Sequence, residues 1–273
     1  MVLSPKPSGE VDQSVLAEAA QLLDLNPAQL STLLGLRLPL PAVEVSDIND
    51  AERLQALLQN LGIDSLAIPM AEMMAMDQSY RVRALAFSAD ELTGLLATGG
   101  SSVSARLDEI VLLVTGRLVV SRAELEQRRK RGGKQTVDSR QLFSDESVLD
   151  FYFTESATSW RIRANAFDFS CLGSLRSATA FENYRILINF LSEKAPQAQL
   201  DDSYSRIRSA LEIGWPIEPR TSTGEWRRRG AGKFNMTTIT TTDNEEQFTR
   251  YSRLRFYLTR RNPQLDGSVG NNG

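Results

Sequence analysis

The chain has 273 residues, of which 41% are hydrophobic and 24% charged, a composition typical of a globular protein with one or two domains. It contains no histidine and a single cysteine, Cys171, which excludes an internal disulfide, a Cys/His zinc site and histidine-dependent catalysis. No apolar run approaches the roughly 20 residues of a membrane span, and the N-terminus lacks a hydrophobic signal region. We therefore expect a cytoplasmic protein without a transmembrane segment.

The charges are unevenly distributed along the chain. Residues 1–80 contain 3 Lys/Arg and 11 Asp/Glu, a net charge of −8, whereas residues 81–273 contain 28 and 23, a net charge of +5. Such asymmetry predicts two units with different surfaces. Two explanations remain open from sequence: the acidic unit binds a basic partner, or it docks on the basic segments of its own chain.

The N-terminal quarter alternates between helical and extended patterns. Residues 1–10 are polar and contain two prolines, which predicts a mobile tail. Asn26 followed by Pro27 is a helix start signal, and Gly62 is a typical residue to follow a helix end. The predicted elements, from apolar spacing and proline positions, are helix 15–23, helix 27–34, extended segment 38–45, helix 47–61 and strand 63–68. Together they predict a small α/β domain over residues 11–69.

In this order of elements, residues 15–68 resemble the C-terminal domain of the bacterial ribosomal stalk protein. The likeness consists of a first helix, a short second helix, a proline-flanked segment, and a helix ending in Leu61-Gly62 before a last strand. The first strand of that family has no clear counterpart in residues 1–10. The resemblance implies an α/β fold. It does not imply the family's binding of translation factors through a basic helical face, because this segment is acidic.

From Tyr80 the apolar pattern changes to the period of two that is typical of strands. Residues 121–147 are polar and predict a long charged loop between two of these strands. Residues 179–193 predict one amphipathic helix, with a core stripe of Phe181, Tyr184, Leu187, Ile188 and Leu191. The expected strands are 80–87, 92–97, 111–114, 118–120, 148–153 and 160–164.

This succession of short strands, one charged hairpin loop and a closing helix resembles a pleckstrin-homology-like (PH-like) domain over residues 80–195. The resemblance implies an antiparallel β-barrel or sandwich closed by a C-terminal helix, and an unrelated α+β sandwich is the alternative. The fold class expected for the whole chain is α+β. The whole chain also resembles a family of bacterial proteins to which no function is assigned.

Residues 196–273 predict a poorly ordered basic region with one terminal helix. The segment 215–242 is rich in Pro, Gly, Arg and Thr and shows poor periodicity. Helical spacing returns at residues 245–261, where Phe248, Tyr251 and Leu254 fall on one face.

Two clusters of basic residues are the candidate binding sites. Each is expected in a loop, where it neutralises phosphates of RNA or of anionic lipid; the alternative is an ordinary solvated surface. In some PH-like domains such loops bind lipid headgroups. Gly232-Lys233 is not part of a phosphate-binding P-loop, because Arg227 and Phe234 occupy its first glycine and its Ser/Thr position. The cluster residues are Arg128, Arg129, Lys130, Arg131, Arg227, Arg228, Arg229 and Lys233.

The remaining candidates favour structural roles. Cys171 has no histidine to activate it, which predicts a buried structural thiol packed with Phe167 and Phe169 under the helix 179–193. The acidic pairs 145–146 and 201–202 lack the alternating oxygen ligands of a calcium loop.

These observations predict a non-enzymatic interaction or scaffold protein that binds a protein partner, with no catalytic residue, cofactor or metal. The alternative is a binder of anionic lipid or RNA phosphates through the two basic clusters. An enzyme with a site made only of carboxylates is a third hypothesis, which no motif supports.

Overall fold

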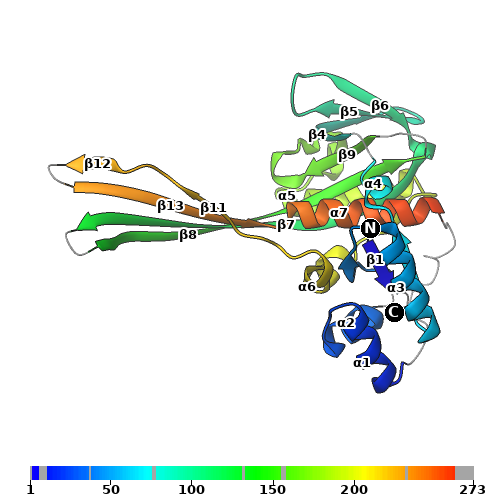
Figure 1. The fold of residues 1–273 in the computed structure, drawn as a ribbon. Helices are drawn as coiled ribbons and strands as arrows, with labels where there is room; N and C mark the ends of the chain where they lie inside the picture. The colour runs from blue at the N-terminus through cyan, green and yellow to red at the C-terminus, as the bar shows by residue number, and fades with distance from the viewer. Residues whose placement is uncertain are drawn as a thin grey trace.

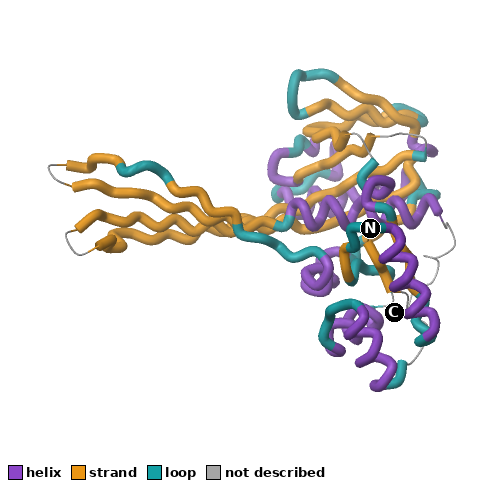
Figure 2. The backbone as a smooth tube through the Cα atoms, in the orientation of Figure 1, coloured by secondary structure: helices purple, strands orange, loops and turns teal. Residues whose placement is uncertain are grey.

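A body of helices and sheets carries a long, narrow arm of strands that projects from one side (Figures 1 and 2). This computed structural model describes residues 2–5, 11–36, 38–75, 78–130, 133–154, 158–230 and 233–261. The fold is mixed α/β, with a small N-terminal sheet and one large curled sheet that runs through the body into the arm.

The N-terminal unit contains a three-stranded antiparallel sheet in the order β2-β1-β3. Its predicted helices and extended segments are confirmed, and Asn26 caps the second helix by accepting a hydrogen bond of 2.8 Å from the Gln29 amide. The elements are β1 (Val2–Pro5), α1 (Gln13–Leu22), α2 (Pro27–Gly35), β2 (Val43–Glu44), α3 (Ile48–Asn60), β3 (Ser65–Ile68) and α4 (Met70–Met73).

The prediction of a tail over residues 1–10 is wrong for its first part. Residues 2–5 form β1, the central strand, which pairs with β2 on one side and β3 on the other. A four-residue strand with both neighbours far away in the sequence leaves no local pattern to recognise it by. Residues 6–10 lie outside the described residues.

The large sheet has ten strands in the order β11-β13-β7-β8-β9-β4-β5-β6, with β10 paired to β7 and β12 paired to β13. Its pairs are antiparallel except β4–β9 and β10–β7. The strands are β4 (Gln78–Phe87), β5 (Glu91–Leu96), β6 (Ser102–Arg106), β7 (Ile110–Lys130), β8 (Gly133–Phe153), β9 (Thr158–Arg163), β10 (Gln199–Asp201), β11 (Arg220–Thr223), β12 (Arg227–Gly230) and β13 (Lys233–Asp243).

Two hydrophobic cores lie on opposite faces of β7 and β8. On one face, Leu112, Val114 and Tyr152 pack with α6 (Tyr204–Gly214), α7 (Glu245–Arg261) and the N-terminal unit. On the other, Leu113 and Phe151 pack with β4, β9 and α5 (Ala180–Lys194). Each such fully buried side chain contributes about 1.5–3 kcal/mol of transfer free energy, so this part of the hairpin is the centre of the body.

The structure corrects two predictions of irregular chain. Residues 121–147 form the outer halves of β7 and β8 rather than a loop, and the segment 215–242 contains β11, β12 and β13 rather than weakly ordered chain. These strands form the arm, where water reaches both faces of the sheet. They therefore lack the alternation of apolar and polar residues that marks a strand with one buried face.

Helix α5 confirms the predicted amphipathic helix, except for one residue of its stripe. Tyr184, Leu187 and Leu191 are buried in the core, whereas Phe181 is 57% exposed and lies outside it. Phe181 belongs to the first turn, where Thr179 caps the helix by accepting a hydrogen bond from the Glu182 amide. The 3-10 segment Phe169–Leu175 packs beneath α5, as expected for the residues around Cys171.

Helix α7 has the predicted bounds, 245–261, and lies between the large sheet and the N-terminal unit (Figure 1). Arg250 forms an ion pair of 2.7 Å with Glu44, and Arg261 one of 3.5 Å with Glu72. The acidic unit thus docks on basic residues of its own chain, although they belong to α7 and not to either basic cluster. None of the described helices combines the length and the apolar content that a membrane crossing needs.

Gly214, the last residue of α6, lies directly against the N-terminal unit. A Cβ atom at Gly214 would collide with the backbone carbonyl of Pro41, which a side-chain rotation does not relieve. We expect Gly214→Ala to lower the free energy of unfolding by about 1–3 kcal/mol, measured by urea denaturation. Gly35→Ala at the end of α2 is the control, because nothing lies within 4 Å of its Cβ position. Equal stability of the two variants would contradict this packing.

Candidate interaction arm

The arm extends the large sheet to one side (Figure 2). β8, β7 and β13 run along it, and the place beside β13 is taken first by β11 and then, farther from the body, by β12. β7 pairs with β8 continuously to Lys130↔Gly133, and with β13 from Val120↔Asp243 to Arg128↔Asn235. β13 has the sequence KFNMTTITTTD, in which Thr and Ile are β-branched and favour strands. Backbone pairing and β-propensity therefore hold the arm together, in place of a core.

The register gives the arm two different faces. One face is charged: Arg122 pairs with Glu124 at 2.7 Å, and Asn235 donates a hydrogen bond of 2.9 Å to Glu126. The opposite, uncharged face carries hydroxyl, amide and apolar side chains. Its members, from the cross-strand pairs, are Ser121, Ala123, Leu125, Ser139, Gln141, Phe143, Thr221, Thr223, Thr238, Thr240 and Thr242.

β8 is an edge strand along the outer half of the arm. In the described chain its second neighbour, β9, pairs only with residues 148–151. Nearer the body, Asn165 covers the edge by donating a hydrogen bond of 3.3 Å to the carbonyl oxygen of Asp145. Residues 133–144 thus present backbone groups on one side to solvent, the arrangement that natural sheets usually shield.

Large apolar side chains are exposed along this same edge. Phe143 is 68% exposed, Leu142 56% and Val137 43%. Seven large apolar side chains are exposed in the described residues, and these three lie within seven positions of one strand. The sequence analysis missed them because it placed residues 121–147 in a loop; the adjacent Leu142-Phe143 in a polar segment was the available signal.

The basic clusters, about one hundred residues apart in the sequence, meet at the end of the arm. Arg227 on β12 and Arg128 on β7 flank the same residue of β13, Asn235, and Arg128 donates a hydrogen bond of 3.3 Å to its side chain. Arg129 and Lys130 continue β7, Arg228 and Arg229 continue β12, and Lys233 begins β13. The expectation of two loops is therefore corrected to neighbouring strands. Arg131 lies outside the described residues.

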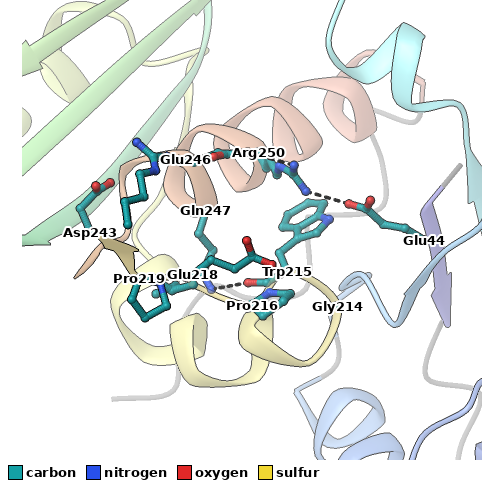
Figure 3. Close-up of a pocket in the computed structure, with 12 residues that line it drawn as sticks. Glu44, Gly214, Trp215, Pro216, Glu218, Pro219, Asp243, Glu246, Gln247 and Arg250 are labelled. Carbon is teal, nitrogen blue, oxygen red and sulfur yellow. Dashed lines mark hydrogen bonds and ion pairs between the residues drawn. The ribbon is translucent and has the colours of Figure 1, made fainter. Parts of the chain in front are cut away.

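A pocket of about 400 Å³ lies at the root of the arm, beside the segment 215–219 that connects α6 to β11 (Figure 3). Arg250 extends across it between Glu44, at 2.7 Å, and Glu246, at 2.9 Å. Gln247 donates a hydrogen bond of 2.9 Å to the carbonyl oxygen of Trp215. Arg250 and Glu44 thus link α7 to the N-terminal unit, and Arg220 links β11 to α7 through an ion pair of 3.3 Å with Glu246.

Two buried ion pairs anchor α7 on the large sheet. Arg161 contacts Asp150 through two hydrogen bonds of 2.7 and 2.8 Å, and Ser252 of α7 donates one of 2.8 Å to the same carboxylate. Arg255 lies 2.5 Å from Asp201. Among the described residues, no group of three or more Cys, Asp and Glu side chains is arranged to hold a metal ion.

Cys171 is half-buried beside the second core, and burial raises the pKa of its thiol to about 11. At neutral pH the thiol is therefore protonated and a poor nucleophile, since the thiolate is the reactive form. This agrees with a structural role for the residue.

No protein-family model, curated protein or solved structure matches this chain.

The raised pKa of Cys171 predicts a specific pH dependence. Because the folded-state pKa lies above its ordinary value of 9.0, the rate of alkylation by iodoacetamide is expected to keep rising about tenfold per pH unit up to pH 10. In urea-unfolded protein, whose thiol has its ordinary pKa, the rate should level off above about pH 9. Mass spectrometry of quenched samples measures both rates, and a plateau near pH 9 in the folded protein would contradict the burial.

Proposed function

We propose that this chain is a non-enzymatic interaction or scaffold protein that binds a protein partner through its projecting arm. The observation that carries the proposal is the exposure of Val137, Leu142 and Phe143 along the unpaired edge of β8. An open strand edge offers a row of backbone donors and acceptors to an extended partner, and alternate side chains then supply specificity. Exposed aromatic residues are frequent anchors of protein interfaces.

The two buried carboxylates among the described residues of the body, those of Asp150 and Asp201, support a role without catalysis. Asp150 and Asp201 are buried, and each is bound by an arginine and by hydrogen bonds from its neighbours. A carboxylate that acts as acid or base needs access to a substrate. Instead these groups hold α7 in place, consistent with a body that supports the arm.

We also keep the two fold resemblances as proposals. The order β1-α1-α2-β2-α3-β3 supports the likeness of the N-terminal unit to the stalk-protein domain, since β1 supplies an initial strand. The successive antiparallel strands β4–β6 and β7–β9, with α5 packed on one face, support the PH-like assignment for residues 80–195. Neither resemblance specifies a ligand, because a fold alone does not fix function.

A second candidate function is the binding of RNA or of anionic lipid at the end of the arm. The observation that favours it is the register that places Arg227 and Arg128 on either side of β13. Only β13 separates the strands that carry the two clusters, and phosphate binding grows with the number of cations that act together.

The first proposal predicts that contacts with a partner concentrate at Phe143. A photo-crosslinking residue in place of Phe143 is expected to give discrete crosslinked products with protein partners in a cell lysate. Phe181 on α5 is the matched control, because it is also an exposed phenylalanine but lies outside the arm. Adding Leu142→Asp should remove the products formed at position 143. The same products from both positions would contradict the proposal.

The second candidate predicts a strong salt dependence. Binding to single-stranded RNA or to vesicles with anionic lipid should weaken steeply with salt, and Arg227→Ala/Arg228→Ala/Arg229→Ala should reduce the slope of log affinity against log salt for RNA by about 2. The control Arg81→Ala/Arg83→Ala/Arg176→Ala removes the same charge from exposed positions outside the arm. Fluorescence anisotropy and vesicle co-sedimentation measure the two bindings. Equal effects of the two triple variants would exclude a specific site.

A further inference from the structure

The free edge of β8 is long enough to pair with a strand of comparable length. Residues 134–144 have no strand beside them on the outer side within the described chain, and at about 3.4 Å per residue they extend over about 34 Å. Their backbone is already held in strand conformation by β7. Pairing with a second strand would therefore require little further ordering of this chain.

The charges on this edge are self-complementary. Asp138 and Arg140 lie two residues apart on the charged face, on either side of Ser139. If two copies of β8 pair antiparallel about a twofold axis at Ser139, each Asp138 stands opposite the Arg140 of the other copy. Within one chain the two side chains form an ion pair of 3.1 Å, and they remain 46% and 71% exposed. An exposed pair of this kind adds little stability by itself, and across the axis the two pairs would make one group of four alternating charges. Opposite charges in directly facing positions stabilise a strand pair.

The same register uses the available length. A twofold axis at Ser139 lies at the middle of residues 134–144, so that the two free edges face each other along their whole length, with the bulge at Val137 interrupting the regular ladder on either side of the axis. An axis at Asp138 or at Arg140 would place two like charges directly opposite each other, which destabilises the pair. An axis at Phe143 would press the partner against residues 145 and 146, where Asn165 covers the edge.

The opposite edge of the arm does not favour self-pairing. β12 carries Arg227, Arg228 and Arg229 in succession, so two copies would bring six positive charges together. Charged residues on an edge strand are a common protection against pairing. On β8, by contrast, acidic and basic residues alternate, and the exposed apolar side chains lie among them.

From these observations we infer that the partner of the β8 edge is a second copy of this chain, paired antiparallel over residues 134–144 about an axis at Ser139. The inference rests on the proposed function, since it names the partner that the arm binds. The paired arms form one continuous sheet, in which the end of each arm lies beside the root of the other.

Charge exchange across the axis tests the pairing. We expect the full chain to be a dimer in sedimentation equilibrium, and Arg140→Asp or Asp138→Arg alone to weaken dimerisation at least tenfold. Because one variant then has two acids at the axis and the other two bases, mixing them should restore a dimer that contains one copy of each. Unchanged thermal unfolding at low concentration shows that each variant is folded.

Disulfide crosslinking of introduced cysteines, in a Cys171→Ala background, measures the register of the pairing independently. Facing residues of an antiparallel pair have Cα atoms about 4.5–5.5 Å apart, within the range of a disulfide, so Ser139→Cys should oxidise to a covalent dimer. Ser144→Cys is the matched control on the same strand, because the two copies of this position lie about 34 Å apart in the proposed register.

Each other outcome overturns the self-pairing. A monomeric chain whose position 143 still crosslinks to a different protein overturns the second copy as partner and leaves the proposed function standing. A monomeric chain without crosslinks overturns both. A dimer that ignores the charge variants, or that crosslinks equally at positions 139 and 144, overturns this edge and register.

Discussion

The pairing of β7 with β8 is the constraint on which the rest of the structure depends. Near the body the two strands separate two hydrophobic cores, with Leu112 on one face and Leu113 on the other. Farther out the same pairing continues to Lys130 and Gly133, beyond both cores of the described chain. One backbone ladder therefore runs through the centre of the body and sets the direction in which the arm projects.

Polar side chains near the ends of strands stabilise the root of the arm through hydrogen bonds and an ion pair. Asn244, between β13 and α7, accepts a hydrogen bond of 2.7 Å from the Val119 amide and donates one of 3.0 Å to the Arg117 carbonyl. It thus replaces strand pairing where β13 leaves β7. The buried pair of Arg161 and Asp150 costs desolvation free energy, and removing one partner typically destabilises a protein by about 3–5 kcal/mol. With Ser252, this pair fixes the position of α7, and β13 precedes α7 directly.

The sequence predicted those elements that contact a hydrophobic core on at least one face. The helices of the N-terminal unit, α5 and α7 follow from apolar spacing, and β4, β5 and β9 from alternation. The arm escaped prediction because Thr238, Thr240 and their neighbours face water on both sides of the sheet and show no such pattern. The basic residues were identified, but their meeting depends on the register of β13 between β7 and β12. No local signal encodes a register between segments about one hundred residues apart.

An exposed apolar edge invites unspecific association, so the features that restrain it decide what it can bind. Val137 is the extra residue of a β-bulge opposite Glu126 and Gln127, and bulges disturb the regular ladder that an arbitrary strand would need. Asp138 and Arg140, which pair with each other at 3.1 Å within the chain, disfavour apolar or like-charged side chains in facing positions. The apolar groups at 142 and 143 add affinity only for a partner that satisfies these conditions. The apolar side chains that attract a partner and the bulge and charges that exclude unsuitable strands therefore lie in the same segment, residues 133–144. This arrangement favours one defined partner over aggregation.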